Sequence, residues 1–299
     1  MLRTRVLTAA VLAPAVLAAA YLGEPWLSIV LALLAFFALA ELIALLDAAG
    51  FAPPQVLGLA AGLATTCAGL VAANSGNVGG LLNALLSATQ PPGLVAVAFA
   101  GSLVLLALAA FTRGEPGQGF LTWSTTSFGI AYVGLLLPFV ALVAQLGPGS
   151  GAAQGTVGWL GLRSGTAWLL MLILVVWGYD TGAYLTGRWL GRRRLIGHIS
   201  PSKTVEGVAG GLVVATLAAG LGAGLTGLAP WHPLLIGPVV GGAAQAGDLA
   251  ESMLKRAADR KESGFLIPGH GGILDRIDSF LFAAPVLFGY ALLVARVAP

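Results

Sequence analysis

Long apolar runs, separated by short polar segments, dominate the chain. Nine such runs recur from residue 6 to near the C-terminus, and five of them contain no charged residue. An α-helix rises about 1.5 Å per residue, so about 20 residues cross the roughly 30 Å of hydrocarbon in a bilayer. We therefore predict an all-α polytopic membrane protein with about nine transmembrane helices, at residues 6–22, 26–46, 55–73, 94–111, 127–146, 167–186, 208–228, 234–254 and 279–297.

The first run follows Arg3 and Arg5 and resembles a signal peptide in outline. A second apolar run, 26–46, follows at once, which favours an uncleaved first helix. We interpret Glu41 and Asp47, near the end of this second run, as interfacial residues.

The composition supports the membrane assignment. Of 299 residues, 58% are hydrophobic and only 9% are charged, whereas a soluble domain usually carries about 25% charged residues. This deficit of charge excludes a soluble globular domain and a disordered chain alike. The single cysteine, Cys67, excludes a disulfide framework, and a net charge of +3 without a basic arm argues against a nucleic-acid partner.

The charged residues predict both an orientation and a division of the chain. With the N-terminus in the cytoplasm, thirteen of the fifteen basic residues fall on the cytoplasmic side of nine spans. We therefore expect the C-terminus outside. Eighteen of the twenty-seven charged residues lie between residues 180 and 278. This predicts a scaffold at 1–150 and a catalytic half at 151–299, joined near the Gly-rich segment 147–165.

A polar stripe marks the eighth predicted span. Asp248, Glu251, Ser252 and Lys255 fall on one face of a helix. Asp248 lies well inside the run, where a carboxylate costs on the order of 2.5 to 3.5 kcal/mol unless it is paired or hydrated. It therefore requires a cation.

A glycine turn, Pro268-Gly-His-Gly-Gly272, leads into the last helix. Asp275 and Asp278 follow it three residues apart, so they share a helix face. With Asp248 they would supply the hard oxygen ligands that Mg²⁺ prefers. We expect the glycines and the helix N-terminus to bring backbone N–H groups to phosphate oxygens. Further phosphate charge would be neutralised by Lys255, Arg256, Lys261 and Arg276. The combination indicates phosphoryl or nucleotidyl transfer.

A third cluster surrounds the sixth and seventh spans and gives a weak signal by itself. Asp180 and Tyr184 lie near the end of one span, and Ser200-Pro-Ser-Lys203-Thr204 opens the next. We expect Pro201 near a helix start, with hydroxyl and ammonium donors around it for an anion.

These motifs together resemble the phosphatidate cytidylyltransferases, also called CDP-diacylglycerol synthases. The family's long signature, ending P-G-H-G-G-x-x-D-R-x-D, is matched from Ser252 through Asp278. Residues 200–207 look like its S-P-K-K-T-x-E-G element, and residues 180–187 look like its D-x-x-A-Y-x-x-G element. Two positions depart from the pattern: Ser202 replaces a lysine, and Glu262 replaces an aspartate.

The resemblance implies that the phosphate of phosphatidic acid attacks the α-phosphorus of CTP with the help of Mg²⁺, at the cytoplasmic face of the inner membrane. It implies CTP, phosphatidic acid and the bilayer as partners. We expect Asp248, Asp275 and Asp278 to bind metal and Asp248, Asp275, Lys255 and His270 to be catalytic. The expected substrate-binding residues are Ser200, Lys203, Thr204, Arg256, Lys261, Arg276 and Asp180.

Several alternatives stay open. The sequence leaves open whether a second, monovalent cation binds. A homodimer is also possible, because small-residue spans such as 207–227 would permit close helix packing within or between subunits. Arg192, Arg193 and Arg194 are typical of topology anchors or lipid-headgroup contacts. The competing functions are another lipid cytidylyltransferase, a lipid kinase, and a transporter whose intramembrane carboxylates form an ion path.

Overall fold

The computed structural model describes residues 13–74, 93–147, 156–157, 162–267 and 271–297. Its contacts divide the chain into two compact units. The first unit comprises Met1–Ala141 and Leu254–Ile277, and the second comprises Leu142–Met253 and Asp278–Pro299. The segment that carries most of the signature therefore belongs to the same unit as the N-terminal helices.

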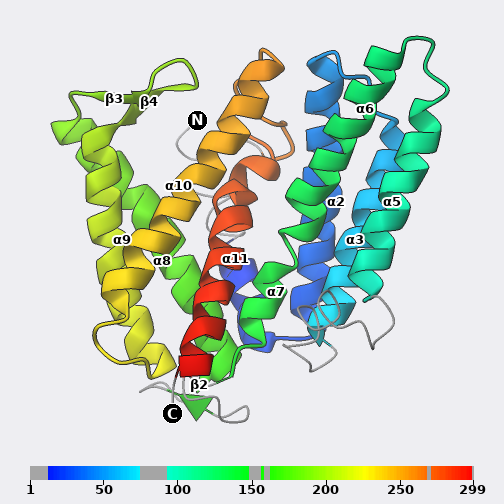
Figure 1. The fold of residues 1–299 in the computed structure, drawn as a ribbon. Coiled ribbons are helices and arrows are strands. Elements are labelled where there is room, and N and C mark those ends of the chain that lie inside the picture. Colours follow the sequence, from blue (N-terminus) through cyan, green and yellow to red (C-terminus); the bar gives the residue numbers. More distant parts are fainter. Residues whose placement is uncertain (1–12, 75–92, 148–155, 158–161, 268–270, 298–299) are drawn as a thin grey trace. The chain divides into compact units, whose positions relative to one another are not determined.

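The first unit is built from apolar helices that lie side by side (Figure 1). Leu39 and Leu42 of the second predicted span are each only 1% exposed, and they belong to its core. The elements of this unit are a short helix at Ala13–Leu22, then α2 (Trp26–Ala48), α3 (Gln55–Asn74), α5 (Leu94–Ala110), α6 (Pro116–Gly129), the π-helix η1 (Ile130–Leu135) and the start of α7 (Phe139–Ala144).

The predicted fifth span begins earlier and is less regular than its hydropathy indicates. It starts at Pro116, which has no N–H to leave unpaired and suits the first position of a helix. The π-helix η1 and a turn at residues 136–138 interrupt it before α7 resumes. Pro138 lies at this break, and its missing N–H removes a helical hydrogen bond there.

The second unit contains most of the remaining helices and two small hairpins. Two of its helices, α8 (Ser164–Leu190) and α9 (Val205–Thr226), pack against each other (Figure 1). The other elements are β1 (Thr156–Val157), β2 (Leu162–Arg163), β3 (Arg194–Ile196), β4 (Ser200–Thr204), α10 (Pro233–Ala257) and α11 (Leu274–Val297). The last turn of α10 and the first turn of α11 belong to the first unit.

Pro201 lies near a helix start, as expected, but in a strand that precedes the helix. Residues 200–204 form strand β4, which pairs antiparallel with β3, and α9 begins only at Val205. Thr204 is the N-cap, since its Oγ accepts from the Gly207 N–H at 3.1 Å. A threonine in extended conformation is a favourable N-cap, so the strand delivers the cap to the helix.

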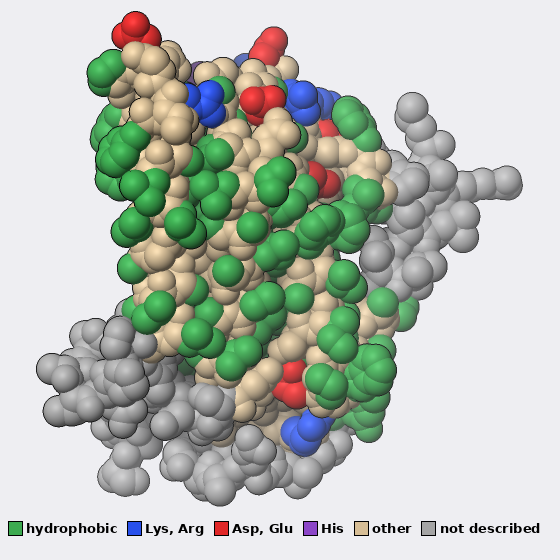
Figure 2. Space-filling model, turned by 90° about the vertical axis from the view of Figure 1, so that its right-hand side faces the viewer, with side chains coloured by type: hydrophobic (Ala, Val, Ile, Leu, Met, Phe, Trp, Pro, Cys, Tyr) green, Lys and Arg blue, Asp and Glu red, His purple; other side chains and the backbone are tan. Residues whose placement is uncertain are grey.

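The predicted all-α membrane fold is confirmed. Among the described residues, six helices are long and apolar enough to cross a membrane, and Ala13–Leu22 and α5 are shorter apolar helices. Helix α10 is long enough to cross a membrane but does not belong to these groups, because the charged residues Asp248, Glu251, Lys255 and Arg256 lower its hydropathy. Hydrophobic side chains cover much of the face in Figure 2, while the charged ones lie towards the helix ends.

Candidate active site

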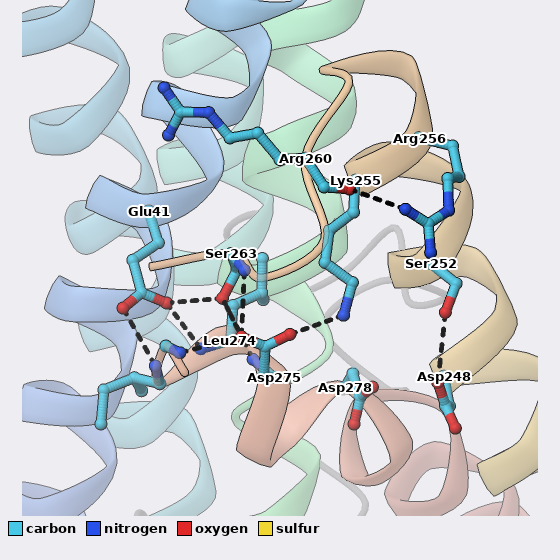
Figure 3. A network of polar contacts seen from close by, with 12 residues as sticks. Glu41, Asp248, Ser252, Lys255, Arg256, Arg260, Ser263, Leu274, Asp275 and Asp278 are labelled. Carbon is cyan, nitrogen blue, oxygen red and sulfur yellow. Dashed lines mark hydrogen bonds and ion pairs between the residues drawn. The ribbon is translucent and has the colours of Figure 1, made fainter. Parts of the chain in front are cut away.

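Asp275 lies in the first turn of α11 and accepts hydrogen bonds on both carboxylate oxygens (Figure 3). Lys255 Nζ donates to Oδ1 at 2.5 Å. Oδ2 accepts from Ser263 N at 3.0 Å, Ser263 Oγ at 2.9 Å and Gly272 N at 2.8 Å. The Lys255 and Asp275 side chains are 12% and 8% exposed, so the ion pair is largely shielded from water. One side chain therefore ties the end of α10, the connection after it and the glycine turn together.

A second carboxylate reaches the same place from α2. Glu41 Oε1 accepts from Ile273 N at 3.0 Å, and Oε2 accepts from Leu274 N at 2.8 Å and lies 3.0 Å from Ser263 Oγ, whose one hydroxyl proton it shares with Asp275 (Figure 3). Helix N-termini leave N–H groups unsatisfied and favour a negative charge nearby. Glu41 thus caps α11 from more than 220 residues away in the sequence.

These bonds alter the expected role of the glycine turn. The N–H groups of Gly272, Ile273 and Leu274 were expected to meet phosphate, but here they donate to the chain's own carboxylates. The glycines make room for the same carboxylates. A Cβ at Gly272 would lie 2.3 Å from Glu41 Oε2, and one at Gly264 would lie 2.5 Å from Glu41 Oε1.

In the second unit, a lysine and an aspartate join the hairpin to α10. Lys203 of β4 pairs with Asp248 Oδ2, and Ser252 Oγ donates to Asp248 Oδ1 at 3.4 Å. The Asp248 side chain is 32% exposed and so remains accessible to a ligand, whereas the Nζ atom of Lys203 is buried. The cation that Asp248 requires is therefore Lys203.

Helices α10 and α11 cross closely beside Asp248. A Cβ at Gly247 would lie 2.4 Å from the Asp278 carbonyl oxygen, so glycine permits this approach. Asp278 is 7% exposed, and its Oδ1 accepts from Ser279 N at 2.6 Å. Tyr179 of α8 donates its hydroxyl to Gln245 Oε1 at 2.9 Å, one turn earlier on α10.

The other predicted site residues are distributed over both units. Arg256 is exposed and donates to the Arg260 carbonyl at 3.2 Å. His270 lies outside the described residues. Lys261 and Arg276 are exposed and belong to the first unit, and Asp180 is exposed in the second unit. On β4, Ser200 is buried and Thr204 is half-buried.

The acidic residues differ in how well they would suit a magnesium ion. Within the described part of the chain, no three His, Cys, Asp or Glu side chains form a group that would hold a metal alone. Magnesium at nucleotide sites is usually bound by one or two carboxylates together with phosphates and water. The accessible Asp248 suits this arrangement. Asp275 already accepts four hydrogen bonds, so metal binding there requires Lys255 to move.

Sequence reasoning missed Glu41 and Ser263. Ser263 is 2% exposed and bonds both carboxylates, although it looks like an ordinary loop serine. The available signal was Glu41 itself, since a carboxylate inside an apolar run is costly unless it has donors.

Comparisons with known proteins agree with the motifs. The profile of a family described as "Cytidylyltransferase family" matches residues 3–294. A phosphatidate cytidylyltransferase of Synechocystis sp. is 37% identical over 229 residues, which is 71% of this chain and 76% of that protein. The phosphatidate cytidylyltransferase of Bacillus subtilis is 48% identical over 126 residues, and that of Staphylococcus saprophyticus is 45% identical over 125. These two alignments cover 42% and 41% of this chain, and 47% and 48% of the relatives.

Proposed function

Because the chain belongs to the cytidylyltransferase family, we propose that it is a phosphatidate cytidylyltransferase, which transfers CMP from CTP to phosphatidic acid and releases pyrophosphate. The observation that carries this proposal is the 37% identity to such an enzyme over 71% of the chain, well beyond the signature. The paired lysines and carboxylates described above are the groups that this chemistry needs.

The reaction forms one phosphorus–oxygen bond and breaks another. An oxygen of the phosphatidate phosphate attacks the α-phosphorus of CTP, and the bond from that phosphorus to the oxygen bridging to the β-phosphate breaks, so pyrophosphate leaves. The attacking phosphate is already an anion at neutral pH, so no strong general base is required. The main barrier is repulsion between the anionic lipid and the triphosphate, and positioned cations lower it.

Basic residues would bind and orient the two anions. We assign the phosphate contacts to Lys255 and Lys203, each of which would exchange part of its carboxylate pairing for a substrate oxygen. A wider set of contacts follows from the motifs: Arg256, Lys261, His270 and Arg276 for phosphates, and Ser200, Thr204 and Asp180 for substrate binding.

Magnesium, when bound, would screen the triphosphate and polarise its oxygens. Its proposed protein ligands are Asp248, Asp275 and Asp278, and of these the accessible Asp248 suits the role best. A second, monovalent cation and a homodimer extend this proposal.

The site would face the cytoplasm, where CTP is available. In the proposed orientation the N-terminus is cytoplasmic and the C-terminus lies outside an inner membrane, because this places most basic residues on the cytoplasmic side. The site residues would then lie near the membrane–water interface, where a lipid headgroup meets a soluble nucleotide. All the catalytic, substrate-binding and metal-binding residues of this proposal belong to the C-terminal half of the sequence, residues 151–299.

The test uses the full chain purified in detergent. CTP, phosphatidic acid and Mg²⁺ should together give equal amounts of pyrophosphate and CDP-diacylglycerol, and omission of the lipid or addition of EDTA should stop both. Parallel reactions with ATP and with diacylglycerol or other lipid acceptors distinguish a kinase and other cytidylyltransferases. Production of ADP, or no product with any acceptor, would contradict the proposal.

A further inference from the structure

We propose that Glu41 of α2 is a positioning residue for this reaction, which holds the α10–α11 connection (residues 258–267 and 271–273) so that Lys255 faces the substrates. The inference rests on the proposed function for its chemistry. Its geometry lies entirely within the first unit.

The first support is the number and kind of bonds that Glu41 makes. Its two oxygens accept from two backbone N–H groups at the start of α11 and from the Ser263 hydroxyl, all within 3.0 Å. These donors come from the interior of the connection and from its junction with α11. A carboxylate at a helix N-terminus is favoured by the helix dipole, so the position suits a glutamate.

The second support comes from the glycines. Side chains at Gly264 and Gly272 would occupy the space that the Glu41 carboxylate fills, at 2.5 and 2.3 Å. The connection thus has glycine at the two positions where a Cβ would collide with the Glu41 carboxylate. Its sequence therefore fits a carboxylate in this place.

The third support is a chain of bonds that leads from Glu41 to a substrate-binding cation. Ser263 Oγ lies 3.0 Å from Glu41 Oε2 and 2.9 Å from Asp275 Oδ2. Asp275 Oδ1 in turn accepts from Lys255 Nζ at 2.5 Å. Glu41 therefore acts through Ser263 and Asp275 on Lys255, without being a catalytic residue itself.

Asp47 provides the contrast that an interfacial acid should show. It lies on the same helix, six residues after Glu41, and is exposed, whereas Glu41 is half-buried against the connection. Both acids were interpreted alike from the sequence. Of these two acids, only Glu41 accepts hydrogen bonds from backbone N–H groups of the signature in the described structure.

The experiment measures Glu41→Gln, Ser263→Ala and the double variant that combines them. Asp47→Asn is the matched control, and all proteins are full chains in detergent with phosphatidic acid. Glutamine keeps the size of Glu41 but leaves one N–H of the α11 start without an acceptor. We expect kcat to fall about 10- to 100-fold, as for a displaced catalytic group. The KM for CTP should change less than kcat, and the thermal midpoint should fall only by the few degrees that one unpaired N–H costs. In the double variant, kcat should stay within about threefold of the lower single-variant value, because both side chains act through the same bonds. Asp47→Asn should match the wild type.

Tryptic cleavage after Arg260 or Lys261 supplies a readout that does not depend on activity. It should become faster in Glu41→Gln relative to cleavage at Arg192–Arg194, which serves as the internal reference in the other unit. If the wild type is inactive, the proposed function fails, and cleavage alone decides whether Glu41 holds the connection. Wild-type kcat, or unchanged relative cleavage, in a folded Glu41→Gln variant would overturn the inference. If that variant fails to fold, Ser263→Ala decides by the same two criteria.

Discussion

At the scale of single residues, Asp275 and Lys255 form a largely buried ion pair in the described part of the first unit. Both side chains are about nine-tenths buried, and their 2.5 Å hydrogen bond is charge-assisted. Removing one partner of such a pair leaves the other charge uncompensated, which can cost about 3 to 5 kcal/mol when the pair is fully buried. The pair thus links stability to function.

Asp275→Asn should abolish pyrophosphate release while the protein stays folded. Asparagine keeps the shape and one acceptor oxygen, so the loss of stability should be about 1 to 3 kcal/mol. The loss of charge removes both the partner of Lys255 and a proposed magnesium ligand. Pyrophosphate assays and thermal unfolding measure the two effects, with the exposed Glu115→Gln as the control. Full activity in Asp275→Asn would refute its catalytic role.

His232 gives the second unit a pH-dependent stability. It is 6% exposed, and its Nδ1 lies 2.6 Å from the Tyr290 hydroxyl. Burial lowers the pKa of His232, because the charged imidazolium would lose its hydration. As the pH falls below the ordinary histidine value of about 6.5, the unfolded chain takes up a proton before the folded chain does.

The folded state should therefore lose stability as the pH falls from about 7.5 to about 5.5. In His232→Gln this part of the pH dependence should disappear. Thermal unfolding of both proteins in detergent across that range is the measurement. Parallel pH profiles would show that His232 does not contribute.

At the scale of elements, hydropathy predicted where the helices lie but not where all of them begin. The last predicted apolar run starts at residue 279, whereas the helix that carries it, α11, begins at Leu274, as the shared face expected for Asp275 and Asp278 requires. The added turn holds Asp275, Arg276 and Asp278, whose charges lower the local hydropathy, and it is capped by Glu41 from a distant helix. A cap supplied from another part of the chain leaves no local trace in the sequence.

The candidate site was predictable to the extent that its residues lie in one motif. Asp248, Lys255 and Asp275 were identified as candidates from spacing and charge, but the pairing of Asp248 with Lys203 was not. The β3–β4 hairpin brings Lys203 to Asp248, and the sequence pattern had not predicted a strand in this polar segment. Such pairings depend on tertiary contacts, so helical spacing cannot supply them.

The crossing of α10 and α11 predicts opposite effects for two glycines of one helix. In Gly247→Ala the new Cβ would meet the Asp278 carbonyl oxygen at 2.4 Å, and backbone cannot easily give way. We expect a loss of about 1 to 3 kcal/mol. Gly242→Ala meets nothing within 4 Å and should gain about 0.5 to 1 kcal/mol, because alanine favours helix. Thermal unfolding compares them, and equal effects would contradict the close crossing.

At the scale of the whole molecule, the chain is a multi-pass membrane protein whose first unit is discontinuous in sequence. The helices before residue 142 supply most of this unit, and residues 254–277 complete it. The N-terminal part of this unit provides Glu41, whose carboxylate accepts hydrogen bonds from the signature.

The proposed orientation predicts which loops a membrane-impermeant maleimide reaches. The only cysteine, Cys67, is replaced by serine, and Arg260→Cys or Trp231→Cys is then introduced at an exposed position. Arg260→Cys should be labelled only in inside-out vesicles, because the orientation places it in the cytoplasm. Trp231→Cys should be labelled in intact cells. The reverse pattern would contradict the orientation.

The long separation between Glu41 and its partners also orders events during synthesis. The ribosome completes α2 more than 200 residues before it makes Ser263 and the start of α11. The Glu41 carboxylate is therefore without these donors in the nascent chain until translation nears its end. A product that stops before residue 254 contains the early helices but not the last segment of their unit, so it lacks both Lys255 and Asp275.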